Sequence, residues 1–305
     1  MSPNLEPYDE LSLFAENAAE AGLPWKGAPT VRREFVEVAP GRSVSALVWG
    51  EGPLDLVLIH GGAQNAHTWD TVALALDRPL VAVDLPGHGH SDWPGDTRVL
   101  EPRAVAEDVA VAISTLAPSP SLVVGMSMGG MTSIALATSH PTLVPKLLLV
   151  DITPGVTPSK SSDIGAFLNG PESFASFDEI LERTIQFNPT RSESSLRRGV
   201  LHNAVQREDG SWTWRHQINR KIADQALPVG SIRYAPLWDD LEAIAGPVLL
   251  TRGALSPVVD DADQAEFHRR RPHDDVIVVE GAGHSIQGDR PLELAGIIAD
   301  FLERP

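Results

Sequence analysis

Short, unbroken runs of apolar residues recur along most of the chain, and between them apolar positions repeat with helical spacing. A run such as Leu-Leu-Leu-Val at 147–150 is typical of a strand covered on both faces, because every side chain of such a strand meets other protein. Strands alternating with helices predict an α/β fold with a mostly parallel, doubly wound sheet. We expect the strands at Leu56–Ile59, Leu80–Val83, Leu122–Val124, Lys146–Val150, Val248–Thr251 and Val276–Val279. We expect the helices at Thr68–Leu76, Pro102–Leu116, Gly129–Ser139, Val259–Arg270 and Pro291–Leu302.

Two stretches depart from this alternation. Residues 1–30 form an N-terminal extension with a short amphipathic helix over Leu11–Ala21, and a hairpin of strands at Arg33–Val38 and Ser43–Trp49 follows it. Residues 153–235 contain no buried-type strand. We therefore expect an α/β core at 31–152 and 236–305, with a helical cap inserted at 153–235 over the carboxyl end of the sheet. The cap helices are expected near 163–169, 173–187, 193–206 and 215–226.

Charge and composition exclude several classes of function. The 24 basic and 41 acidic side chains give a net charge of −17, which disfavours nucleic acid and anionic membranes as partners. The chain holds no cysteine, so disulfides, cysteine zinc sites and a thiol nucleophile are excluded. No apolar run approaches the roughly 18 residues that span a bilayer, and residues 1–10 lack the features of a secretory signal. We expect a cytoplasmic protein that acts on a small molecule; the sequence leaves its oligomeric state open.

The strongest chemical signal is a serine between two glycines at the end of an apolar strand. Residues 121–130 read Ser-Leu-Val-Val-Gly-Met-Ser-Met-Gly-Gly, and a helix is expected directly after them. On so tight a strand-to-helix turn Ser127 points its hydroxyl away from the backbone, and a Cβ at Gly125 or Gly129 would crowd the turn. The N-terminal amides of the helix aim at the same place, where they can stabilise a developing negative charge. The pattern favours a nucleophilic serine.

Two further glycine-rich loops follow buried strands. The first begins His-Gly-Gly at 60–62, and its backbone amides can donate to an oxyanion. The second reads Asp-Leu-Pro-Gly-His-Gly-His-Ser at 84–91. Its His88 and His90 have no third ligand nearby, so we expect them to be structural and expect no metal site.

These loops, the serine turn and the Gly-Ala-Gly-His at 281–284 resemble the motifs of the α/β-hydrolase superfamily, in the family's order and on the expected elements. The likeness covers about residues 31–152 and 236–305. It implies a nucleophile–acid–histidine triad in that chain order, with Ser127 as nucleophile and His284 as general base. It also implies that the backbone amides of Met128 and Gly62 donate to the oxyanion, with the amide of Ala63 as the alternative to that of Gly62. The resemblance implies no cofactor.

The acid of the triad is where the chain departs from the commonest pattern. Many relatives carry it on the loop after the strand that corresponds to Val248–Thr251, but here that loop has Pro257 where an aspartate is expected. Asp151 lies at the end of the strand after the nucleophile helix, and some members of the superfamily carry their acid there. Asp260 or Asp261 is the alternative, although an aspartate at a helix start is explained as a cap. We favour Asp151.

We expect a serine hydrolase that cleaves a carboxylic ester of a small, largely apolar substrate through an acyl-enzyme. Met126 and Trp69 are expected to line an apolar approach to Ser127. Trp212 and Trp214 of the cap are expected to contact an acyl or aromatic group of the substrate.

Other functions on the same fold stay open. One is a carbon–carbon bond hydrolase of ring-cleavage products, which uses the same triad. Such an enzyme needs basic side chains in the cap to bind the carboxylate of its substrate. A second is a non-catalytic ligand-binding protein, and a third is cofactor-free oxidation of small acids. The basic groups available are Arg191, Arg197, Arg198, Arg215 and Arg220.

Overall fold

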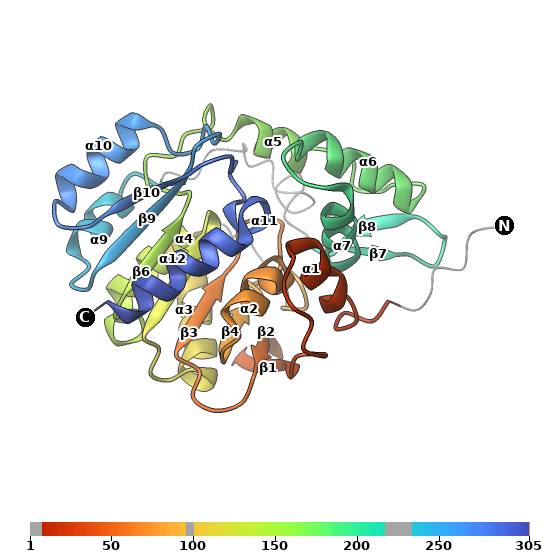
Figure 1. The fold of residues 1–305 in the computed structure, drawn as a ribbon, viewed down its shortest axis with the longest axis horizontal. Coiled ribbons are helices and arrows are strands. Elements are labelled where there is room, and N and C mark those ends of the chain that lie inside the picture. The colour runs from red at the N-terminus through yellow and green to blue at the C-terminus, as the bar shows by residue number, and fades with distance from the viewer. Residues whose placement is uncertain (1–7, 96–100, 217–233, 305) are drawn as a thin grey trace.

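An eight-stranded, mostly parallel sheet forms the centre of the molecule, in the strand order β1-β2-β4-β3-β5-β6-β9-β10. The computed structural model describes residues 8–95, 101–216 and 234–304 (Figure 1). β1 pairs antiparallel with β2 and β2 pairs antiparallel with β4, whereas the remaining pairs are parallel. The predicted α/β class with a mostly parallel, doubly wound sheet is confirmed. The strands are β1 (Val31–Ala39), β2 (Arg42–Trp49), β3 (Leu56–Ile59), β4 (Leu80–Val83), β5 (Leu122–Met126), β6 (Leu147–Val150), β9 (Val248–Gly253) and β10 (Val276–Val279).

Helices pack on both faces of this sheet and bury its strands. Alternate residues of β3 point to opposite faces: Val57 and Ile59 join one hydrophobic cluster, and Leu56 and Leu58 join the other. The first cluster includes residues of α3 (Pro102–Leu116), α4 (Met128–Ser139), α9 (Leu237–Ala243) and α10 (Asp261–Arg270). The second includes residues of α1 (Phe14–Ala21), α2 (Asp70–Leu76), α11 (Ile286–Asp289) and α12 (Pro291–Glu303).

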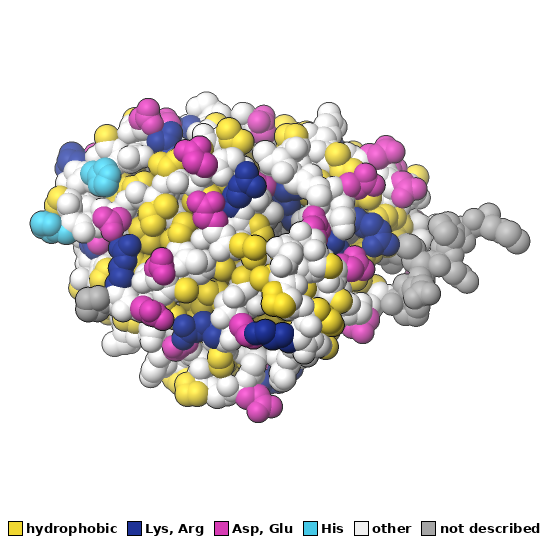
Figure 2. Space-filling model, viewed as in Figure 1, with side chains coloured by type: hydrophobic (Ala, Val, Ile, Leu, Met, Phe, Trp, Pro, Cys, Tyr) yellow, Lys and Arg dark blue, Asp and Glu magenta, His cyan; other side chains and the backbone are white. Residues whose placement is uncertain are grey.

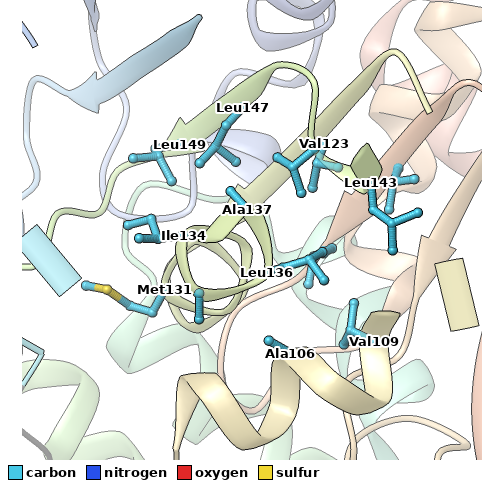
Figure 3. Packing of buried hydrophobic residues seen from close by; sticks show 14 of the residues in the cluster. Ala106, Val109, Val123, Met131, Ile134, Leu136, Ala137, Leu143, Leu147 and Leu149 are labelled. Carbon is cyan, nitrogen blue, oxygen red and sulfur yellow. The ribbon is translucent and has the colours of Figure 1, made fainter. Parts of the chain in front are cut away.

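The helix that begins beside Ser127 is deeply anchored. Figure 3 shows α4 between the sheet, represented by Val123 and Leu149, and α3, represented by Val109. Ile134 and Leu136 of α4 have no exposed surface. Since burying each such side chain contributes about 1.5–3 kcal/mol, the N-terminus of α4 is held firmly at the end of β5.

The core differs from expectation mainly at helix ends. The helix expected at Thr68–Leu76 begins with a 3-10 turn at Ala66–Trp69, where the side chain of Asn65 accepts a hydrogen bond from the amide of His67. α9 and α11 are not predicted by the apolar pattern, because helices so short do not display a helical period. The N-terminal helix expected over Leu11–Ala21 begins three residues later, at Phe14.

The inserted segment contains helices and a small antiparallel sheet. α5 (Ser162–Leu168), α6 (Phe177–Phe187) and α7 (Glu193–Asn203) correspond to the helices expected near 163–169, 173–187 and 193–206. β7 (Ala204–Gln206) and β8 (Trp212–Trp214) pair antiparallel, which the helical prediction does not include. The Asp209-Gly210 turn between them, with Gly210 at φ 86°, is the hairpin signal that indicates this sheet. Beyond residue 216, the helix expected near 215–226 lies outside the described residues.

The N-terminal extension bridges the core and the inserted segment. Phe14 of α1 is buried, and its ring centroid lies 4.8 Å from that of Trp49 in the core. On the other side, Arg198 of α7 donates to Asn17 Oδ1 at 2.7 Å and forms an ion pair with Glu20. Figure 1 shows α1 between α2 and α7.

Charges of both signs are spread over the surface. Figure 2 shows acidic and basic side chains interspersed over one face of the protein, whose overall charge is −17. Within the described ranges, no helix is both long and apolar enough to cross a membrane.

Candidate active site

Ser127 lies at a strained turn between β5 and α4. Its backbone has φ 50° and ψ −117°, a combination that residues with a side chain rarely adopt. A methyl group on Gly125 would lie 2.7 Å from the carbonyl oxygen of Gly129, and one on Gly129 would lie 2.4 Å from that of Ile59. Both contacts are too short for carbon and oxygen, so both positions require glycine. The structure therefore has the tight turn that the glycine pattern predicts.

Three side chains from the ends of different strands meet at this turn. His284, which follows β10, places its Nε2 3.0 Å from Ser127 Oγ. Its Nδ1 lies 2.8 Å from Oδ2 of Asp151, which follows β6. Because a carboxylate accepts hydrogen bonds, Nδ1 carries the proton and Nε2 is left to accept from the serine hydroxyl. The arrangement can therefore take a proton from Ser127.

Asp151 is the carboxylate that the fold brings to His284. It is fully buried, with φ 50°, and its Oδ1 accepts a hydrogen bond of 2.8 Å from the amide of Gly253. Asp260 instead caps α10 by accepting from the amide of Asp263 at 3.0 Å. Asp261 pairs with Arg252 at 2.6 Å. These two aspartates thus have other structural partners.

The loop that begins at His60 packs directly on the serine turn. A methyl group on Gly61 would meet Met126 Sδ at 2.4 Å, and one on Gly62 would come within 3.7 Å of Met128 Sδ. Gln64 holds this loop, since its Oε1 accepts from the amide of Gly61 at 3.1 Å. The two residues expected to supply oxyanion donors, Gly62 and Met128, therefore lie side by side.

The residues expected to line the substrate pocket are largely buried. Trp69 has no exposed surface and Met126 is 1% exposed, and both belong to the cluster between the sheet and α12. Trp212 and Trp214 belong to the cluster of the inserted segment, where the ring of Trp214 stacks on His216. Packing accounts for all four positions, and their part in binding substrate stays a prediction.

The loop at 84–91 is organised around a buried carboxylate. Asp84 accepts hydrogen bonds from Arg33 at 2.7 Å and from the amide of His90 at 3.1 Å. Burial alone would raise the pKa of Asp84, but the charge of Arg33, the nearby His60 and hydrogen bonds from Ser45 and the amide of Ala66 together hold that pKa below its usual value. His88 is buried, and its Nδ1 lies 3.1 Å from the carbonyl oxygen of Pro86.

A buried polar network, which the sequence does not reveal, joins the N-terminal segment to α2 and α7. His67 Nδ1 lies 2.9 Å from Asp70 Oδ2 and its Nε2 lies 3.2 Å from Glu10 Oε2. Burial opposes the charge of His67, yet Asp70 and Glu10 raise its pKa to about 9. The ring of His202 stacks on that of His67 with 3.9 Å between centroids, and the hydroxyl of Tyr8 is hydrogen-bonded to His202 Nδ1 at 2.6 Å. No spacing signal in the sequence connects positions so far apart.

His67, Asp70 and His202 also offer ligand atoms within 4.8 Å of one another, as a metal site would. However, the two rings are parallel to within 9°. The lone pairs of stacked rings run side by side instead of converging on one ion, and the proton of His67 already lies between its Nδ1 and Asp70. The geometry fits a hydrogen-bonded ion network.

Comparisons with known proteins identify the family to which this fold belongs. Residues 56–297 match the model of the Alpha/beta hydrolase family. The chain is 42% identical to Esterase Rv0045c of Mycobacterium tuberculosis, over 98% of this chain and 97% of that protein. The crystal structure of that esterase superposes with a TM-score of 0.82 at 41% identity, and the superposition covers 99% of this chain and 100% of the other. It is 32% identical to a 3-hydroxybutyrate-oligomer hydrolase of Cupriavidus necator, over 81% of this chain and 88% of that protein. The structure of an E-2-(acetamidomethylene)succinate hydrolase gives a TM-score of 0.78 at 25% identity, with 90% and 100% coverage. The chain belongs to the alpha/beta hydrolase family.

Proposed function

We propose that this protein is a serine esterase that cleaves a carboxylic ester of a small, largely apolar substrate through an acyl-enzyme. The observation that carries the proposal is the chain of contacts from Ser127 through His284 to Asp151, at 3.0 and 2.8 Å. Nε2 of His284 removes the hydroxyl proton as Oγ attacks the ester carbonyl carbon. The carboxylate of Asp151 then stabilises the imidazolium and keeps its tautomer.

The tetrahedral intermediate carries a negative oxygen that needs hydrogen-bond donors. We assign this role to the backbone amides of Met128, the first residue of α4, and Gly62, because the two residues pack together beside Ser127. The imidazolium of His284 protonates the leaving alcohol as the intermediate collapses. A water molecule, deprotonated by the same imidazole, then attacks the acyl-enzyme and releases the carboxylic acid.

The substrate would be held between the core and the inserted segment at 153–235, which we propose acts as a cap. The segment has an aromatic interior, in which Phe167 and Phe174 lie edge-on to Trp214 at 5.6 and 5.9 Å between ring centroids, and contact of an apolar ligand with this cluster stays a prediction. The names of the relatives support an ester, since one is an esterase and another a hydrolase of 3-hydroxybutyrate oligomers.

Four of the five basic groups that could serve a carbon–carbon bond hydrolase have other partners. Arg198 pairs with Glu20, and Arg191 donates to the hydroxyl of Ser195 at 2.6 Å. The guanidinium of Arg197 lies over the ring of Phe177 and that of Arg215 over the ring of Tyr8. Arg220 lies outside the described residues. These contacts favour ester cleavage over recognition of a substrate carboxylate.

Turnover of p-nitrophenyl butyrate by Ser127→Ala tests the proposal. We expect kcat to fall by about 10⁴-fold or more, because the covalent route is lost, with the melting temperature unchanged. Ser139→Ala is a matched control, since that hydroxyl bonds to the carbonyl of Ala135 further along α4. Retained turnover in Ser127→Ala would place the nucleophile elsewhere.

A fluorophosphonate probe separates the esterase from a ligand-binding protein. The wild type should be labelled at Ser127, and the Ser127→Ala variant should not. Hydrolysis should also slow towards acid pH, since a protonated His284 cannot accept the serine proton. Failure of the folded wild type to react with the probe would favour the binding protein.

A further inference from the structure

The loop after β9 reaches the triad although it does not carry the acid. This is the loop in which Pro257 stands where the family resemblance places an aspartate. Ser256, the residue before Pro257, is 8% exposed. The hydroxyl of Ser256 donates to Asp151 Oδ2, the oxygen that also faces His284 Nδ1. The same hydroxyl oxygen accepts from the amide of Val258 at 3.2 Å. Because a carboxylate oxygen accepts and the amide of Val258 donates, the hydroxyl proton lies between Ser256 Oγ and Asp151 Oδ2.

The loop is also fixed to the segment that carries the histidine. The amide of Leu255 donates to the carbonyl of Ala282 at 2.9 Å, and that of Ala254 to the carbonyl of Val279 at 3.0 Å. A methyl group on Gly253 would lie 2.2 Å from the carbonyl oxygen of Gly283, the residue before His284. One rigid connection therefore holds both the acid and the base.

We propose that Ser256 is a positioning residue for the esterase reaction, acting through Asp151. With the amide of Gly253 on Oδ1 and the hydroxyl of Ser256 on Oδ2, both carboxylate oxygens are held and the plane of the carboxylate is set towards His284. The hydroxyl also withdraws charge from Oδ2, so that the carboxylate holds the proton on Nδ1 less strongly than it would unaided. This inference rests on the proposed function.

The sign of the effect on pH dependence follows from that hydrogen bond. Removal of the hydroxyl in Ser256→Ala concentrates charge on Oδ2, which stabilises the protonated imidazole, and leaves the carboxylate freer to rotate. We expect kcat to fall by about 10-fold with KM nearly unchanged, and the acid limb of the pH–rate profile to move up by about one pH unit. Ser256→Thr keeps the hydroxyl and should restore both values to near the wild type.

Two further variants guard against a merely structural effect. Thr251→Val removes a buried hydroxyl of β9 itself, one that donates to the carbonyl of Leu149 at 3.1 Å, and should leave the pH–rate profile unchanged. Ser256→Cys fills the same space with a weak donor and should give an intermediate shift, so it serves if the alanine variant folds poorly. A Ser256→Ala variant with a lowered melting temperature but an unmoved acid limb, or a limb moved to lower pH, would overturn the proposal.

The esterase assignment itself is tested separately by the Ser127→Ala variant on the same substrate. If that variant is inactive while Ser256→Ala shows the wild-type profile, the positioning role fails and the esterase stands. If Ser127→Ala remains active, both fail.

Discussion

Raising the pH from about 6 to about 9 removes the charge of one buried imidazole, and we expect the fold to lose stability as a result. His67 is held between Asp70 and Glu10, which raise its pKa to about 9, against about 6.5 in an unfolded chain. Burial lowers the pKa of His202 well below its usual value and raises that of Tyr8, while hydrogen bonds from His67 and Arg33 lower that of Glu10. Burial also raises the pKa of Asp70, which the charge of His67 opposes, so the stability assigned to His67 belongs to the His67–Asp70 pair.

The size of the loss follows from the displacement of that pKa. A group whose pKa is raised on folding stabilises the fold fully below its unfolded pKa, and this contribution declines as pH rises and is lost above the folded value. A rise of roughly 2.5 units at about 1.4 kcal/mol per unit corresponds to about 3.5 kcal/mol for His67, of which about 3 kcal/mol is lost between about pH 6 and about pH 9 and the rest above that pH.

Urea unfolding at several pH values measures the contribution of the His67 charge to the unfolding free energy. The reference is the His67→Gln variant, because the glutamine side chain does not titrate. The difference in unfolding free energy between the two proteins should shrink by about 3 kcal/mol between pH 6 and pH 9. Curves that stay parallel over this range would refute the reasoning, because they would mean that His67 is not protonated in the folded protein.

Asp151→Asn should lower kcat for p-nitrophenyl butyrate by about 10⁴-fold through the wrong imidazole tautomer, whereas Asp260→Asn should leave kcat near the wild-type value, because asparagine caps a helix about as well as aspartate. Equal loss of activity in both would contradict the assignment of the acid. Gly129→Ala should yield little soluble protein, because its methyl group would lie 2.4 Å from the carbonyl oxygen of Ile59; a normal melting curve would argue against that packing. Arg198→Met should lower the urea-unfolding free energy by about 1–2 kcal/mol, discounted for the partial exposure of its partner, and an unchanged value would mean that α1 does not depend on α7.

The apolar pattern predicted the elements that are buried on both faces. Strands such as β3 and β6 read as unbroken apolar runs because they lie inside the sheet, and glycines mark the serine turn because only a hydrogen fits beside Ile59. Asp151 could be singled out because the carboxyl ends of neighbouring parallel strands, β5 and β6, meet at one edge.

Features that depend on contacts between distant segments could not be predicted. Ser256 becomes a partner of Asp151 only when β9 pairs with β6, and no local pattern records that contact. The same holds for the network of Glu10, His67 and His202, whose members belong to three separate parts of the chain. The β7–β8 hairpin is different, because its Asp-Gly turn was available in the sequence as a signal.

His284 depends on an outermost strand. β10 is an edge strand, beside β9, and its Val278 is 42% exposed. This edge of the sheet therefore has fewer buried contacts than the central strands that precede Ser127 and Asp151. Local fraying there would withdraw the imidazole while the rest of the molecule stays intact. The half-life of activity at elevated temperature should then be shorter than the melting curve suggests. Stabilising the β10 edge of the sheet would lengthen that half-life without any change to the core.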